Sequence, residues 1–279
     1  MKLEQFLRIS DFTAFPFNIK PASSANIWVG RPEILQQMLN FRDDVIVNGL
    51  SEFGILTGRR GSGKSHSLLH LKYLVEQFQE GRPSLCIYID NPIGMGSKGT
   101  FVENYRYLLT FILGKENTQL IFKSAMQEFQ KRSSATDQSH HGNRSDLAGK
   151  YHDLVGDSPI RYDLFQAILK NAKNWWEWLG GAPRISKVGH ETVQALTSHV
   201  LCAKSLATIV KLATMLNSDK KPIAYNAVFI LVDQTEDLAR LPGGAFQDQV
   251  VGWRTLIDEI DSRFGMLWAM EGSAEDIEA

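Results

Sequence analysis

The sequence predicts an α/β fold in which helices cover both faces of a parallel β-sheet. Four short apolar runs rich in β-forming residues alternate with segments of helical periodicity, a pattern typical of strand–helix–strand units. The third run, residues 227–232, is apolar throughout, which indicates a central strand buried on both faces. The first run, residues 53–57, leads directly into a glycine-rich loop. The sequence therefore predicts a parallel sheet whose first strand ends at a loop that could bind a ligand.

The other elements follow from the same two periodicities. The apolar runs predict strands at 53–57, 85–89, 227–232 and 264–270. Helical spacing predicts helices at 65–78, 101–113, 121–129, 162–179, 191–216 and 246–260. A polar stretch rich in Ser, His and Gly, residues 133–150, predicts an exposed loop. The 279 residues fit one large domain or one domain with an insertion.

Composition narrows the class of protein. Hydrophobic residues make up 43% of the chain and charged residues 22%, so we expect a packed globular core. The net charge of −1 provides no global basic field for nucleic acid, although a local basic patch stays possible. We find neither a run long enough to span a bilayer nor a signal-peptide pattern, and so expect a cytoplasmic protein without a membrane partner. Cys86 and Cys202 lie within apolar patterns, which predicts buried, reduced thiols.

The glycine-rich loop carries the strongest chemical signal. It matches the P-loop pattern G-x-x-x-x-G-K-[ST] at every defined position, and it lies between a predicted strand and a predicted helix. Its residues are Gly58, Arg59, Arg60, Gly61, Ser62, Gly63, Lys64 and Ser65. Glycines let the backbone wrap phosphates, Lys64 would reach the β- and γ-phosphates, and the Ser65 hydroxyl would bind Mg²⁺. We therefore predict that the chain binds ATP or another purine nucleoside triphosphate together with Mg²⁺.

A P-loop site requires a second group on the metal side besides the Ser65 hydroxyl. This group is a carboxylate at the end of a neighbouring strand. Asp233 follows the apolar third strand directly, at the end where ligand sites of parallel sheets form. We predict that Asp233 helps to hold Mg²⁺. The alternative is that Asp233 only caps the helix that follows it.

Three further segments resemble motifs of one ATPase family. Residues 27–35, IWVGRPEIL, resemble a segment that precedes the P-loop in AAA+ and STAND ATPases. Residues 233–238, DQTEDL, are similar to the Walker B motif of the branch that holds origin-recognition initiators, transposition ATPases and phage-defence ATPases. The fourth strand, with Gly272 and Ser273 after it, resembles the sensor-1 strand. The resemblance covers most of the chain outside residues 116–190.

The resemblance implies an AAA+-like core and further site residues. Ser273, or in second place Glu271, would lie near the γ-phosphate, unless Ser273 is only a turn residue. Residues 15–31 would line the adenine pocket, and we include Arg31 and His66 among the nucleotide-binding residues. The core would comprise residues 1–115 and 191–279, interrupted by a mostly helical insertion at 116–190. The family's strand order is 5-1-4-3-2, and its fifth strand and helical lid would follow Ala279. We expect the free edge of the first strand to be covered.

One departure from the family bears on turnover. Gln234 stands where an active member has the Glu that activates water, and Gln cannot accept a proton. Glu236 is a possible substitute base. The resemblance implies ATP binding that drives assembly or switching, in a homo-oligomer or larger protein complex linked to DNA or to phage defence. One alternative is a nucleotide sensor or scaffold that hydrolyses ATP poorly, and another is a P-loop kinase. We predict a slow ATPase with Lys64, Gln234, Glu236 and Ser273 as candidate catalytic residues.

Overall fold

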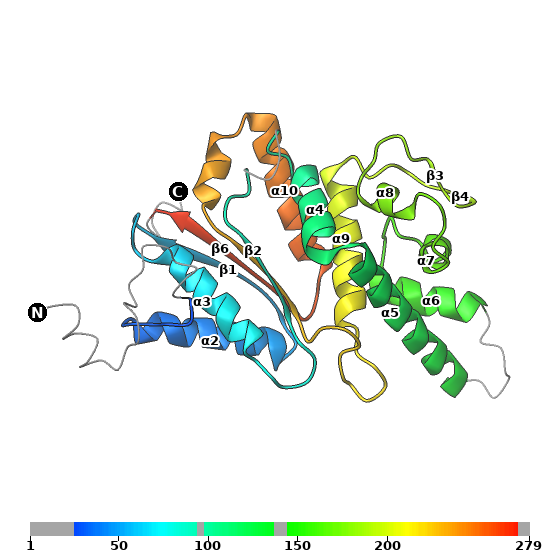
Figure 1. The fold of residues 1–279 in the computed structure, drawn as a ribbon, viewed down its shortest axis with the longest axis horizontal. Coiled ribbons are helices and arrows are strands. Elements are labelled where there is room, and N and C mark those ends of the chain that lie inside the picture. The colour runs from blue at the N-terminus through cyan, green and yellow to red at the C-terminus, as the bar shows by residue number, and fades with distance from the viewer. Residues whose placement is uncertain (1–24, 94–97, 137–143, 273–279) are drawn as a thin grey trace, which may run out of the picture.

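A four-stranded parallel sheet organises the molecule. The computed structural model describes residues 25–93, 98–136 and 144–272 (Figure 1). The strands are β1 (Ser51–Gly58), β2 (Leu85–Ile89), β5 (Val228–Val232) and β6 (Phe264–Glu271). They lie in the order β1-β6-β5-β2, and every neighbouring pair is parallel. The predicted α/β fold with a helix-covered parallel sheet is thereby confirmed, and all four predicted strands form.

Burial explains which strands lie at the centre. All five residues of β5 are buried, as its unbroken apolar run predicts. Successive side chains of a strand point to opposite faces, so the sheet has two apolar layers. Ile230 belongs to one layer and its neighbours Phe229 and Leu231 to the other. Helices must therefore cover both faces.

The two faces carry different helices. On one face lie α2 (Pro32–Ile46) and α3 (Lys64–Glu76). On the other lie α4 (Phe101–Tyr107), α9 (His199–Thr214) and α10 (Gly243–Glu259) (Figure 1). The helices between α4 and α9 in the chain, together with a short hairpin, lie beyond α9 (Figure 1). These outer elements are the π-helix η2 (Leu108–Leu113), α5 (Lys115–Thr136), α6 (Arg144–Val155), α7 (Tyr162–Leu169), α8 (Trp175–Leu179), β3 (Lys187–Val188) and β4 (Glu191–Thr192).

The outer helices share their core with the sheet. The buried side chains of α5, α6 and α7 form one continuous apolar cluster with those of α9, α10 and the adjoining strands. Aromatic rings fill the outer part of this cluster. The ring centroids of Tyr151 and Phe165 lie 4.8 Å apart in a stacked pair, and those of Phe122 and Phe165 lie 5.4 Å apart. The chain between β2 and β5 is thus anchored on the sheet through α9. The division at residues 116 and 190 stays a prediction.

The helices predicted at 162–179 and 191–216 differ in extent from those of the structure, and the one predicted at 121–129 is longer, as α5. The helix predicted at 162–179 divides into α7 and α8, because Asn171 and Asn174 adopt positive φ angles of 52° and 68°. The helix predicted at 191–216 starts late, after β4 and an extended segment. Ser198 caps the start of α9, where its hydroxyl accepts a hydrogen bond from the Leu201 amide at 3.3 Å.

The loop predicted at 133–150 is also partly helical. Helix α5 continues to Thr136 and α6 begins at Arg144, and residues 137–143 between them lie outside the described residues. A hydrogen bond joins the two helices, and an ion pair within α6 shares its acceptor. The Ser133 hydroxyl donates to Asp146 at 2.7 Å, and Lys150 forms an ion pair with the same carboxylate at 2.9 Å. Polar composition alone therefore misassigned these helix ends.

The outer edge of β1 is open in the part of the chain that the structure describes. Strand β1 pairs with β6 on one side, and no described strand pairs with its other side. Phe53 and Ile55 are 42% and 41% exposed there, although Phe53 packs edge-on against Trp268. The expected cover of this edge is not among the described residues.

The buried thiols fit the expectation from their apolar surroundings. Cys86 and Cys202 are both free and buried, as predicted. Burial raises the pKa of the Cys202 thiol to about 12. None of the described helices combines the length and the apolar character needed to cross a membrane.

A close contact between α10 and α4 gives a test of the packing. A Cβ added at Gly252 would lie 2.2 Å from Cγ of Phe101, so Gly252→Ala should lower the free energy of unfolding by about 1–3 kcal/mol. Gly243→Ala in the same helix is the matched control, because open space surrounds that position. It should change stability by less than about 1 kcal/mol. Urea unfolding of both variants measures the difference, and equal stabilities would contradict this packing.

Candidate functional site

The loop between β1 and α3 turns tightly, so that its residues contact one another. A Cβ added at Gly58 would lie 2.7 Å from the Ser62 hydroxyl oxygen, so only glycine fits there without rearrangement. Gly61 and Gly63 have positive φ angles of 77° and 93°, and open space lies where a Cβ would stand on either. Glycine adopts such angles at little cost. The loop therefore has the backbone freedom and the open side that phosphate binding requires.

Positively charged side chains gather at this loop. The Lys64 ammonium donates to the carbonyl oxygens of Gly58 at 2.8 Å and Arg59 at 3.2 Å. The Arg31 guanidinium donates to the Ser62 carbonyl at 2.6 Å. Lys64 is the first residue of α3, which places Ser65 in the first turn at the positive end of the helix dipole. The structure thus brings the predicted P-loop residues and Arg31 together.

The segment before α2 is fastened to α3. The His66 ring Nε2 donates to the Ile27 carbonyl at 2.8 Å, and the His70 ring Nδ1 donates to the Ala25 carbonyl at 2.6 Å. The Trp28 ring packs on both imidazoles, with centroid distances of 5.9 and 5.1 Å. Sequence reasoning included His66, and Trp28 as part of residues 15–31, but missed His70. The four-residue spacing of the two histidines, which puts them on one helix face, is the signal that could have suggested the pair.

Asp233 lies at the carboxyl end of β5. It is 2% exposed, and its amide donates to the Ile89 carbonyl at 2.8 Å, so the ladder with β2 continues to this residue. Its Oδ1 accepts from the Gln234 amide at 2.9 Å and its Oδ2 from the Tyr88 hydroxyl at 2.9 Å. Burial and the nearby negative charge of Asp233 raise the pKa of Tyr88, so this hydroxyl stays a donor.

The helix-cap alternative for Asp233 does not describe its contacts. The 3₁₀-helix η3 (Thr235–Arg240) has Gln234 as its N-cap residue, and no side chain caps it. A capping carboxylate accepts from the second or third amide of a helix, whereas Asp233 accepts from the Gln234 amide that precedes η3. The carboxylate is held between β2 and the start of η3.

The two candidate bases differ in their contacts. Gln234 is exposed and adopts a left-handed conformation, with φ 54° and ψ 39°. The Glu236 carboxylate accepts from the backbone amide of Glu271 at 3.0 Å, and the Thr235 hydroxyl donates to the Ala269 carbonyl at 3.1 Å. Glu236 thereby fastens η3 to the end of β6. The remaining candidate, Ser273, lies outside the described residues.

The donor set fits a magnesium–triphosphate complex. Ser65 and Asp233 offer hydroxyl and carboxylate oxygens, the ligand type that Mg²⁺ prefers. The described residues contain no cluster of three or more His, Cys, Asp or Glu side chains that could hold a metal by themselves. Mg²⁺ is usually held by one or two carboxylates plus substrate phosphate oxygens.

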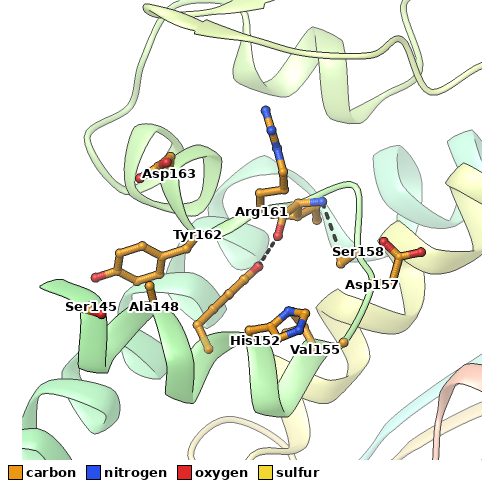
Figure 2. A pocket seen from close by; sticks show the side chains of 12 residues that line it. Ser145, Ala148, His152, Val155, Asp157, Ser158, Arg161, Tyr162 and Asp163 are labelled. Carbon is orange, nitrogen blue, oxygen red and sulfur yellow. Dashed lines mark hydrogen bonds between the residues drawn. The ribbon is translucent and has the colours of Figure 1, made fainter.

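A separate hollow lies between α6 and α7. It has a volume of about 690 Å³, and Figure 2 shows His152 and Asp157 at one end and Tyr162 over Ala148 at the other. Tyr151 forms part of its wall, and its hydroxyl donates to the Ile160 carbonyl at 2.6 Å. The hollow lies among the outer helices, away from β1 and α3 (Figure 1). Its rim carries both signs of charge and selects no single class of ligand.

Comparisons of the chain with protein-family models, with curated proteins and with solved structures gave no match. The assignment of a function therefore depends on the geometry of the loop and of Asp233.

The His70 contact predicts a pH dependence of stability. Burial, helped by repulsion from His66, lowers the pKa of His70 below its ordinary value of 6.5, although the bond to Ala25 opposes this. Below about pH 6.5 the unfolded chain takes up the proton more readily, so the free energy of unfolding falls as pH drops. His70→Gln keeps a donor but cannot titrate. Urea unfolding at about pH 7.5 and about pH 5.5 should show a smaller loss in this variant. Equal losses in both proteins would contradict the assignment.

Proposed function

We propose that the chain binds ATP with Mg²⁺ at the loop from Gly58 to Ser65 and uses the bound nucleotide as a conformational or assembly switch. One observation carries the proposal: a glycine-rich loop with the P-loop sequence joins β1 to α3, and Asp233 stands at the carboxyl end of β5 in the same sheet. Parallel sheets bind ligands at this edge.

The residues of the loop would divide the work of binding. Backbone amides and the N-terminus of α3 would face the phosphates. Lys64 would exchange its bonds to the Gly58 and Arg59 carbonyls for phosphate oxygens, which as anions are the stronger acceptors. Ser65 and Asp233 would hold Mg²⁺, and the bound metal would neutralise phosphate charge. Arg31 would keep the loop closed through the Ser62 carbonyl.

The contacts of η3 favour a switch over a fast motor. Gln234 cannot take a proton from water. The Glu236 carboxylate holds η3 to β6 through the Glu271 amide, which supports a structural role for Glu236. ATP binding would persist without rapid hydrolysis, as in a nucleotide sensor or scaffold. The resemblance to AAA+ and STAND ATPases supports a homo-oligomer or larger protein complex as the context, linked to DNA or to phage defence. No feature of the described residues favours the kinase alternative over this one.

The first test removes the lysine that would contact the phosphates. ATP–Mg²⁺ at about 100 times Kd should stabilise the unmodified protein by about 2.7 kcal/mol. Lys64→Ala should remove most of that gain, which thermal melts with and without ATP–Mg²⁺ would measure. Lys72→Ala is the matched control, because Lys72 lies on the same helix but pairs with Glu76. An equal ATP-induced shift in Lys64→Ala and Lys72→Ala would reject the proposal.

The second test concerns turnover. The missing base should make hydrolysis slow as the chain stands, and Gln234→Glu should raise the rate of phosphate release about 10²–10⁴-fold. Glu236→Gln should change the rate little, since its amide oxygen can still accept from the Glu271 amide. Steady-state phosphate release with and without DNA compares the three proteins. If the unmodified chain turned over at about 1 s⁻¹ or faster and Glu236→Gln stopped it, Glu236 would be the base instead.

A further inference from the structure

Tyr88 stands beside the carboxylate that would hold the metal. In the β2–β5 ladder Tyr88 lies opposite Leu231, and Asp233 follows two positions later. Side chains two apart on a strand share a face, so Leu231 and Asp233 point to the same side of the sheet. Leu231 and Tyr88 both pack in the apolar layer beneath α2 and α3. The Tyr88 hydroxyl and the Asp233 carboxylate therefore meet on the face from which α3 and its loop rise.

The hydrogen bond between Tyr88 and Asp233 determines which lone pairs of the Asp233 carboxylate stay available to a metal ion. A carboxylate has about four lone-pair positions. One on Oδ1 is used by the Gln234 amide and one on Oδ2 by the Tyr88 hydroxyl, both at 2.9 Å. Among the ion pairs of the described residues none involves Asp233. Two neutral donors thus fix the rotation of a buried carboxylate and leave one lone pair on each oxygen for another partner.

We propose that Tyr88 is a positioning residue for the metal: its hydroxyl holds Asp233 in the rotamer that accepts magnesium, or a magnesium-bound water, beside the P-loop. This inference rests on the proposed function. Ligands of metal sites are commonly oriented by hydrogen bonds from a second layer of residues, and loss of such a bond costs about 10–100-fold in metal affinity. The Tyr88 hydroxyl bonds to Asp233 itself, so we expect its effect to act through the metal ligand.

The experiment separates metal from nucleotide. Calorimetric titration gives the ATP affinity of the unmodified protein and of Tyr88→Phe, in EDTA and over a series of Mg²⁺ concentrations. In Tyr88→Phe we expect an unchanged affinity for ATP in EDTA. The Mg²⁺ concentration that gives half of the Mg²⁺-dependent gain in ATP affinity should rise about 10–100-fold relative to the unmodified protein. In an Asp233→Asn background, Tyr88→Phe should add no further change, because the two residues act as one unit.

Tyr151→Phe is the matched control. It also removes a hydroxyl that donates to a nearby acceptor, the Ile160 carbonyl at 2.6 Å, but Tyr151 lies in the outer helix α6. The Mg²⁺ dependence of its ATP affinity should equal that of the unmodified protein. An unchanged Mg²⁺ dependence in Tyr88→Phe would overturn the positioning role while leaving the proposed function intact. An ATP affinity of Tyr88→Phe that is weakened equally in EDTA and in Mg²⁺ would also overturn the positioning role. If the unmodified protein bound no ATP even with Mg²⁺, the proposed function and this inference would both be rejected.

Discussion

The position of β6 between β1 and β5 is the constraint on which the candidate site depends. Neighbouring strands lie about 4.8 Å apart, so this order separates the start of the loop from Asp233 by about 10 Å. The end of β6 fills the space between them and holds η3 through the Ala269 carbonyl and the Glu271 amide. A different strand order would put the same residues at another separation. The loop, the carboxylate and the segment after it form one site because of this sheet.

The sequence alone predicted the elements whose pattern lies within a few neighbouring residues. Apolar runs predicted all four strands of the sheet, and the glycine pattern predicted the loop between β1 and α3. Prediction failed where distant contacts or unusual backbone angles decide the structure: the positive φ angles of Asn171 and Asn174 interrupt a pattern that looks helical throughout. The roles of Tyr88 and His70 were also out of reach. Each depends on a partner far along the chain, Asp233 and Ala25 respectively, that only the fold brings near.

Three segments that are distant in sequence meet at the loop. Arg31 joins the segment before α2 to the Ser62 carbonyl, His66 joins α3 to the same segment, and β6 links the loop to η3. In the proposed function, phosphates would compete for the groups that now bond within the loop. A ligand shifts a conformational equilibrium only through contacts that differ between the two states. The bonds of Lys64 to the Gly58 and Arg59 carbonyls are the contacts that would differ.

The pairing of β1 with β6 also has a consequence for synthesis on the ribosome. Ser51 pairs with Phe264, so β1 meets its only described neighbour roughly 200 residues after it has been made, which at about 5–20 residues per second takes about 10–40 seconds. During that interval the apolar side chains of β1 and the glycine loop have no sheet to join. Such an exposed strand is a target for chaperones and for wrong pairing with other nascent chains. The timing of translation therefore determines when the site can first exist.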